Sequence, residues 1–166
     1  MIIYFSIYSF LGYLMESLYV SALERKWISS GLFKGPYIPL YGFGAIILIY
    51  LKQYLPSNTI IVSILGGICM TLLEYITSIY IEKIFHTHCW DYSHHHFHLH
   101  GRICLYYTIL WCILSGLFIK VIHPFIIQLN LMNDLTTILS LIYLSFMFKA
   151  FINKLKFSKK NGLDLH

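Results

Sequence analysis

Charged residues are scarce in this sequence. Lys, Arg, Asp and Glu together make up 11% of its 166 residues, whereas a soluble domain has roughly 25%. Hydrophobic residues reach 58%. This composition excludes an ordinary water-soluble domain. The 12 basic residues fall between apolar runs and form no stripe on a polar face, so nucleic acid is not expected as a partner.

Several functional motifs are also missing. The chain has no G-x-x-x-x-G-K-S/T phosphate-binding loop, and its four cysteines form no C-x-x-C pair. Cys69 and Cys112 fall in apolar runs, while we predict that Cys89 and Cys104 face the reducing cytoplasm, so no disulfide framework is expected. Because no recognised catalytic motif is present, the sequence predicts a protein that is neither an enzyme nor dependent on a cofactor.

Long apolar runs are what the sequence has instead. A membrane-spanning helix needs about 20 predominantly apolar residues, and the runs predict an all-α, polytopic membrane helix bundle with about five transmembrane helices. No basic residue precedes the first run and no cleavage site follows it, so we expect it to stay as a helix. The alternative is a re-entrant segment near Pro124 and the polar residues 128–134. The predicted spans are residues 2–23, 39–55, 59–81, 103–121 and 135–152.

The basic residues indicate an orientation for these spans. Sorted by the connection in which they fall, ten lie on one side of the predicted bundle, and only Lys52 and Lys120 lie on the other. Basic loops stay in the cytoplasm, so the pattern predicts an N-terminus outside and a C-terminus inside. We expect a multi-pass protein of the plasma membrane, with one transmembrane domain over residues 1–152 and a basic cytoplasmic tail over residues 153–166.

The first and third predicted helices resemble each other. Glu16 and Glu24 near the end of one are spaced by eight residues, as are Glu74 and Glu82 near the end of the other. Each next span then opens with an Ile-x-Leu-Tyr sequence, at residues 38–41 and 103–106. This indicates a parallel internal repeat of a helix-loop-helix unit, helices 1–2 and 3–4. Chance similarity between two apolar strings is the alternative.

Glu16 and Glu74 carry the strongest functional signal. Eight helical residues place each of them about 12 Å deeper than its partner at the boundary, which is well inside the hydrocarbon. An ionisable group at that depth faces the bundle interior, is protonated or has a partner. We expect the two carboxylates to share an interface, as part of a proton or cation relay or as a substrate contact. A structural pin between helices is the alternative.

A glycine- and proline-rich segment precedes the second span. Proline disfavours helix in the residue before it, so the helix is expected to begin at about Pro39. Such interrupted segments line cavities in transporters, although close packing of the glycines explains them equally well. The residues of this motif loop are Gly35, Pro36, Pro39, Tyr41 and Gly42.

The loop between the third and fourth spans is rich in histidine. Seven of the nine histidines lie within residues 86–100. Imidazole and thiolate bind transition metals, but no spacing typical of a dedicated site is present. The candidate ligands for a transition metal are His86, His88, Cys89, His94 and His96.

Five motifs in order resemble a known family. They are Tyr-Ser-Phe-Leu-Gly-Tyr at 8–13 with Glu16, residues 31–42, Leu-Glu-Tyr at 73–75, Trp-Asp-Tyr-Ser at 90–93, and Gly-Arg-Ile-Cys-Leu at 101–105 with Trp111. From about residue 4 to residue 116 the chain resembles the CmpB-like ABC-transporter permease (type IV) family of bacterial membrane proteins. The resemblance implies a permease that works with a separate ATPase subunit. It also implies that the histidines are a local departure, since the family usually has Asn near His98.

Arg102 is expected to join a network with a carboxylate. Its guanidinium can bind one bidentately, and Asp91, Glu16 and Glu74 are the candidate partners, whereas Glu24 and Glu82 at the boundary are expected to be solvated. Two other functions remain alternatives to a permease: an enzyme in which Asp91, the histidines and Arg102 act on a lipid headgroup, and a non-catalytic partner or sensor subunit. We expect the lipid bilayer to surround the protein, and a homo-oligomer is a further alternative.

Overall fold

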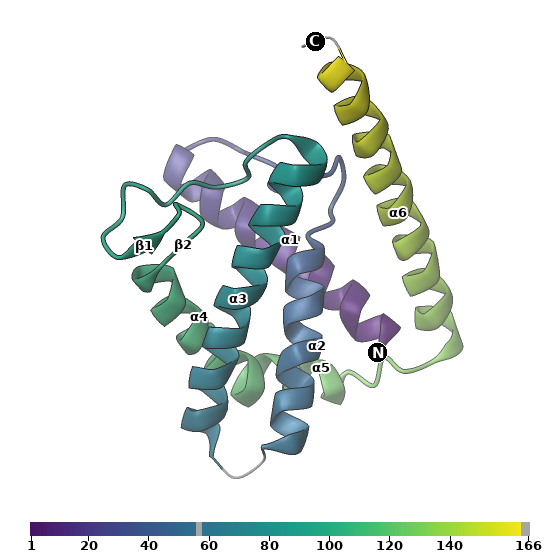
Figure 1. Cartoon of the computed structure of the whole chain (residues 1–166). Helices are drawn as coiled ribbons and strands as arrows, with labels where there is room; N and C mark the ends of the chain where they lie inside the picture. The colour runs from purple at the N-terminus through teal and green to yellow at the C-terminus, as the bar shows by residue number, and fades with distance from the viewer. Residues whose placement is uncertain (56–57, 164–166) are drawn as a thin grey trace.

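The computed structural model describes residues 1–55 and 58–163 of the chain, with side chains described as far as residue 160. Its architecture is all-α, as predicted, with one short hairpin. Figure 1 shows the order of the elements. They are α1 (Ile2–Glu24), α2 (Pro39–Tyr54), α3 (Thr59–Phe85), β1 (His98–Leu99), β2 (Ile103–Cys104), α4 (Leu105–Leu117), the π-helix η1 (Phe118–Ile122), α5 (His123–Gln128) and α6 (Asp134–Leu163).

Five helices result, because α4, η1 and α5 form one continuous segment. Among the described residues, α3, the segment Leu105–Gln128 and α6 are long and apolar enough to cross a membrane. With 16 residues, α2 is about 24 Å long, a little shorter than the hydrocarbon core. Serine, tyrosine and Glu16 make α1 less apolar. The protein is therefore a multi-pass membrane protein.

Local sequence explains where the helices begin and end. Pro39 is the first residue of α2, where its missing N–H is no loss. Asn58 caps α3 by accepting a hydrogen bond from the Ile60 N–H at 2.9 Å. Asn133 and Thr136 form the equivalent cap of α6, where the Asn133 side chain accepts from the Thr136 N–H at 3.0 Å. The predicted starts of these three helices are therefore correct to within one residue.

Two helices are longer than predicted. The fourth does not end at residue 121 but continues through Pro124 to Gln128. The π-helical turn η1, which ends two residues before the proline, widens the hydrogen-bond ladder, so the helical segment continues past Pro124. The fifth, α6, continues past residue 152 to Leu163, so the expected tail is mostly the last turns of α6. Residues 164–166 of that tail lie outside the described residues.

The helices pack through small residues, as is usual in membranes. Gly67 on α3 allows the closest approach to α4, because a Cβ there would lie 2.7 Å from the backbone N and Cα of Cys112. On the other side of the bundle, Gly42 of α2 packs against Ser9 and Phe5 of α1. The buried core lies between these contacts and contains Tyr8, Ala45, Leu48, Val62, Phe118, Ile119 and Ile126.

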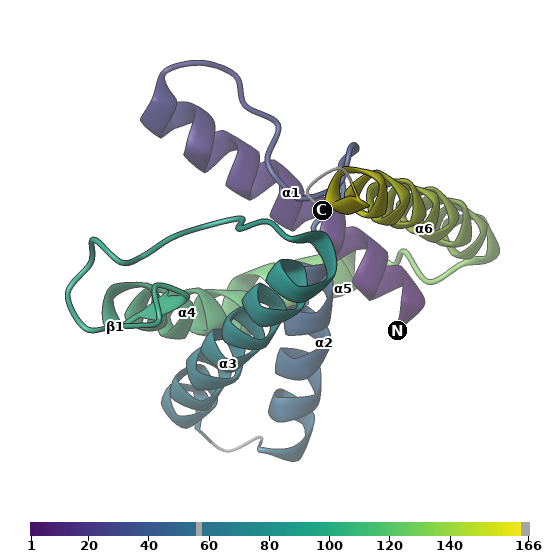
Figure 2. The ribbon, with the colours of Figure 1, turned by 45° about the horizontal axis from the view of Figure 1, so that its top comes forward.

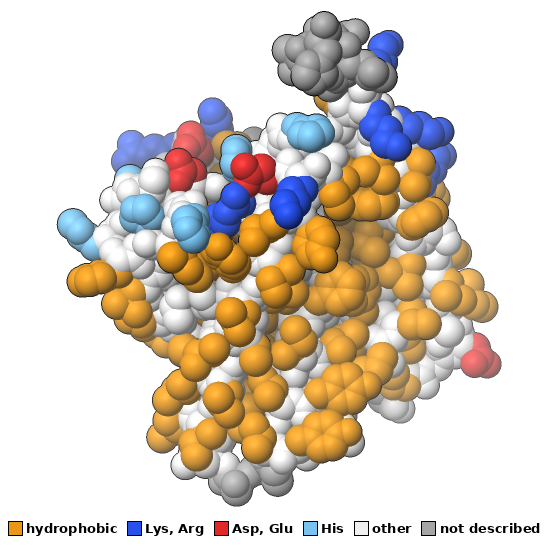
Figure 3. Space-filling model, in the orientation of Figure 1, with side chains coloured by type: hydrophobic (Ala, Val, Ile, Leu, Met, Phe, Trp, Pro, Cys, Tyr) orange, Lys and Arg blue, Asp and Glu red, His pale blue; other side chains and the backbone are white. Residues whose placement is uncertain are grey.

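The arrangement leaves α6 at the periphery. Figures 1 and 2 both show it beside α1 and apart from the middle of the bundle. In the most apolar stretch of α6, only 6% is buried within the protein. Figure 3 shows that the visible face is covered by hydrophobic side chains below a cap of charged and histidine side chains. A broad apolar band with one polar end is the surface that a bilayer requires.

Candidate functional site

Glu74 lies in the middle of the bundle and is almost fully buried, with 4% of its surface exposed. Both of its carboxylate oxygens are hydrogen-bonded. The Tyr92 hydroxyl donates to Oε1 at 2.9 Å, and the Trp111 indole N–H donates to Oε2 at 3.1 Å. Tyr92 comes from the loop after α3 and Trp111 from α4. Neutral donors therefore satisfy this carboxylate, as a buried polar group requires.

Glu16 on α1 is half-buried and has similar partners. Ser30 of the following loop donates its hydroxyl hydrogen to Oε1 of Glu16 at 2.5 Å, and the Tyr41 hydroxyl lies within electrostatic range of the same carboxylate. The loop is held in place because the Ser30 N–H donates to the Ser17 hydroxyl at 3.0 Å. The hydroxyl groups of a loop and of α2 thus surround Glu16.

Tyr41 connects the two glutamates. Its side chain lies within electrostatic range of both Glu16 and Glu74, and its ring centroid is 5.8 Å from that of Trp111. The two carboxylates also interact with each other electrostatically. We call Glu16, Tyr41, Glu74, Tyr92 and Trp111 the polar layer. It brings together two sequence-predicted site residues, one motif-loop residue and two aromatic residues, Tyr92 and Trp111, for which no individual role was predicted.

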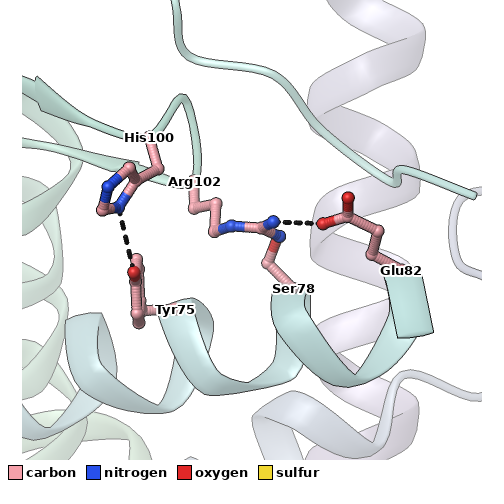
Figure 4. A network of polar contacts seen from close by, with 5 residues as sticks. All are labelled: Tyr75, Ser78, Glu82, His100 and Arg102. Carbon is pink, nitrogen blue, oxygen red and sulfur yellow. Dashed lines mark hydrogen bonds and ion pairs between the residues drawn. The ribbon is translucent and has the colours of Figure 1, made fainter. Parts of the chain in front are cut away.

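Arg102 is not part of this polar layer. Its guanidinium forms an ion pair with Glu82 and donates a hydrogen bond to the Ser78 hydroxyl at 2.9 Å, as Figure 4 shows. Glu82 is partly solvated, as predicted, with 40% of its side chain exposed, but its pairing with Arg102 was not predicted. Ser78 and Glu82 are four residues apart and share one face of α3, so a single guanidinium spans both.

The hairpin β1–β2 determines the position of Arg102. The Trp90 indole N–H donates to the Arg102 carbonyl oxygen at 2.9 Å, and the Tyr75 hydroxyl is hydrogen-bonded to His100 Nδ1 at 3.0 Å (Figure 4). Gly101 turns the chain with φ of 67°, a conformation that glycine adopts without strain. The hairpin was not predicted, because two residues per strand give no recognisable alternation.

Asp91 stabilises the loop. It accepts hydrogen bonds from the Ser93 N–H at 2.9 Å and from the Ser93 hydroxyl at 3.0 Å. The Ser93 N–H, and then the Ser93 hydroxyl, lower the pKa of Asp91 below its ordinary value.

Tyr92 is affected in the opposite direction: burial and then the negative charge of Glu74 raise the pKa of Tyr92 above its ordinary value. Tyr92 therefore stays a hydrogen-bond donor to Glu74 at neutral pH.

The histidine loop offers no preformed metal centre. Over residues 1–55 and 58–163, no three side chains of His, Cys, Asp or Glu lie close enough together to hold a metal ion. His98 Nδ1 instead accepts a hydrogen bond from the Gly101 N–H at 3.1 Å. The five candidate ligands, His86, His88, Cys89, His94 and His96, are not brought together.

The motif loop connects the polar layer to α6. Gly35 has φ of 132°, and Pro36 accepts a hydrogen bond on its carbonyl oxygen from the Tyr143 hydroxyl of α6 at 2.8 Å. Pro39 then begins α2 and places Tyr41 half a turn inside it. In this segment Tyr41 contacts the candidate site, while the glycines and prolines shape the backbone that leads to it.

Two cavities border the polar layer on different faces of α2. One of about 680 Å³ is lined by Glu16, Ser30 and the α6 residues Phe148, Phe151 and Lys154, among others. The other, of about 290 Å³, is lined by residues that include Gly12, Tyr41, Trp111 and Ser115. Volumes of this size are typical of small-molecule sites. Glu16 borders the larger cavity, and Tyr41 borders the smaller one.

Comparisons with known proteins agree with this description of a membrane protein. Neither the curated proteins nor the solved structures gave a match. A family model did match, over residues 3–154, and so includes α6 as well as the region that carries the sequence motifs. The chain belongs to the family described as "Putative ABC-transporter type IV".

Proposed function

We propose that this protein is the permease subunit of an ABC-type transport system, and that the polar layer is where its substrate is handled. Family membership supports the type of system. The observation that carries the role of the polar layer is the position of Glu16 and Tyr41, which lie within electrostatic range of each other and border different cavities. Groups in that position can contact a solute from either cavity.

The glutamates suit this role because neutral groups hold them. A carboxylate paired with Arg or Lys is already compensated, whereas Glu16 and Glu74 accept hydrogen bonds from hydroxyl groups and an indole. Each can therefore take up a proton or a cationic group without first breaking an ion pair. Membrane-embedded carboxylates of this kind are used in relays and substrate sites.

We further propose that the C-terminus is cytoplasmic and that the first four helices arose by duplication. The polar cap in Figure 3 supports the orientation, because basic side chains gather at that end. The contacts support the repeat: the loop that follows α1 donates a hydrogen bond to Glu16, and the loop that follows α3 donates one to Glu74. The two units thus use their loops in the same way.

The proposal requires a separate ATPase subunit, since this sequence has no nucleotide-binding motif. Purification of the full chain in mild detergent should recover an ATPase, identified by mass spectrometry, and the complex should hydrolyse ATP. Recovery of a stable larger complex without an ATPase would support the partner or sensor alternative instead. Recovery of the chain alone, with no transport in vesicles, would contradict the permease assignment.

Substitution tests the role of the glutamates. Glu74→Gln and Glu16→Gln should abolish transport while insertion and melting temperature stay close to those of the unchanged protein, because Gln keeps the size and accepts hydrogen bonds. Glu24→Gln is the matched control, since Glu24 is exposed and only 3.9 Å from Lys26 at the surface. Equal loss of folded protein in both variants would show that the glutamates are structural pins.

The enzyme alternative receives no comparable support. It assigned the chemistry to Asp91, the histidines and Arg102. In the structure Asp91 holds a turn and Arg102 is bound to Glu82 and Ser78. The proposed function therefore leaves this chain without a catalytic step of its own.

A further inference from the structure

We propose that the larger cavity, between α6 and the rest of the bundle, binds a lipophilic organic cation. We call it the lateral cavity. It has a volume of about 680 Å³, within the range of sites that hold drug-sized molecules. Its walls are mostly apolar, and Glu16 is the carboxylate that faces it.

Aromatic rings form a large part of the wall. Phe33, Phe85 and Phe151 make a cluster in which the ring centroids are 5.7 to 6.2 Å apart. Phe43 and Trp90 also line the cavity. The faces of such rings attract cations, more strongly where water is excluded. A wall of rings beside a carboxylate is therefore complementary to a delocalised or alkylated cation with an apolar body.

The charge of Glu16 is available to such a ligand. Its hydrogen-bond donor is the hydroxyl of Ser30, and the Tyr41 hydroxyl lies nearby. The ion pairs seen at the described carboxylates join Lys26 to Glu24 and Arg102 to Glu82, so they do not involve Glu16. A cation that reaches the carboxylate gains attraction at an effective dielectric constant well below that of water.

Lys154 also lines the cavity, and its positive charge favours an anionic ligand instead. It lies in the C-terminal half of α6, on a long flexible side chain that can extend its ammonium group to the headgroup region. Glu16 has less freedom, because its side chain is shorter and accepts a hydrogen bond from Ser30. The charged group with a fixed position in the cavity wall is therefore the carboxylate.

The position of α6 explains how an apolar molecule can enter. Apart from the aromatic cluster and the hydrogen bond from Tyr143 to Pro36, little of this helix is buried in the protein. Figures 1 and 2 show α6 at the edge of the molecule. It contacts α3 through the rings of Phe151 and Phe85. A ligand dissolved in the bilayer can thus reach the cavity sideways without crossing water.

A pair of probes with equal shape and opposite charge tests the inference. Tetraphenylphosphonium and tetraphenylborate are titrated into the purified full-length protein in nanodiscs, with empty nanodiscs as the blank. We expect the cation to bind and the anion to bind at least about tenfold more weakly, because only the cation pairs with the carboxylate. Equal binding of both probes, or tighter binding of the anion, would overturn the inference.

Variants then locate the site. Glu16→Gln should weaken cation binding about tenfold, as expected for loss of a charge-assisted contact, whereas Glu24→Gln and Lys154→Gln should not weaken it. Phe33→Ala should weaken it by a smaller factor. Unchanged affinity in a folded Glu16→Gln protein would also overturn the inference.

The inference deepens the proposed function by naming a substrate class. Only the claim that the cation is transported rests on the proposed function; binding of the cation does not. Binding is measured without an ATPase. Failure of the probes to bind therefore counts against the lateral cavity, while failure to find an ATPase partner counts against the permease assignment.

Discussion

Neutral partners distinguish the deep glutamates from the boundary glutamate Glu82. Glu82 is bound to the Arg102 guanidinium, whereas Glu74 accepts from Tyr92 and Trp111. The Arg102 guanidinium compensates the charge of Glu82, whereas hydroxyl and indole donors satisfy the oxygens of Glu74 without supplying an opposite charge. The same residue type is thus structural at the end of α3 and available for function two turns earlier.

The thiol of Cys89 reports on the charges of the lateral cavity. Loss of surrounding water and the Glu16 carboxylate raise the pKa of Cys89, and the Lys154 ammonium lowers it. A raised pKa means less thiolate at a given pH, so maleimide labelling of Cys89 should be slow at pH 7 and should increase with pH.

Two substitutions should shift this labelling in opposite directions. Glu16→Gln removes a negative charge, lowers the pKa of Cys89 and speeds labelling at pH 7.5. Lys154→Gln removes a positive charge and slows it. Peptide mass spectrometry gives the rate for Cys89 alone, and Glu24→Gln serves as the control. Equal rates in all three variants would contradict the geometry.

The ion pair of Arg102 is expected to hold the hairpin on α3. Glu82→Gln leaves the guanidinium with one neutral partner, and Arg102→Lys cannot span Ser78 and Glu82 together. Both changes should loosen β1–β2 and expose Cys104, of which only 2% is exposed. Faster labelling of Cys104 would show this. Rates equal to those of the unchanged protein would mean that the pair contributes little.

Helices α3 and α4 depend on close approach through Gly67. A methyl group there would lie 2.7 Å from backbone atoms of Cys112, which cannot move aside as a side chain can. We expect Gly67→Ala to destabilise the bundle by about 1–3 kcal/mol, visible as a lower melting temperature in detergent. Ile68→Ala, at a neighbouring position that is 45% exposed, is the control and should change the temperature little.

Helix α6 is attached through few side chains, and Phe151 is central among them. Its ring packs against Phe33 and Phe85. Phe151→Ala should release the end of α6 and increase hydrogen exchange there, with less effect on α3. Phe146→Ala, at a position that is 56% exposed, is the matched control. Equal exchange in both variants would show that the aromatic cluster does not anchor the helix.

The whole molecule presents its charge at one end, which predicts its orientation in the membrane. A fluorescent protein fused to the C-terminus should fluoresce in cells, and alkaline phosphatase at the same position should be inactive, if that end is cytoplasmic. A fusion with the opposite properties would reverse the orientation. It would also place the opening of the lateral cavity nearest Lys154 on the outer side.

The sequence by itself determined that this is a membrane protein with five helices and where α2, α3 and α6 begin. These features depend on local apolar length, on Pro39 and on the capping residues Asn58 and Asn133. It also singled out Glu16 and Glu74, since an acid within an apolar run is recognisable from its neighbours alone. Such signals lie within one or two helical turns of the residue concerned.

Only the tertiary structure decided what those acids contact. Trp111 is 37 positions from Glu74 and Tyr92 is 18 positions away, so which donors face the carboxylate depends on how loops and helices fold together. The same holds for Arg102, because Glu82 was not among its predicted partners and the two side chains meet only where the hairpin lies against α3. The lateral cavity, too, exists only because α6 packs at the periphery, a result of interhelical contacts that no single segment encodes.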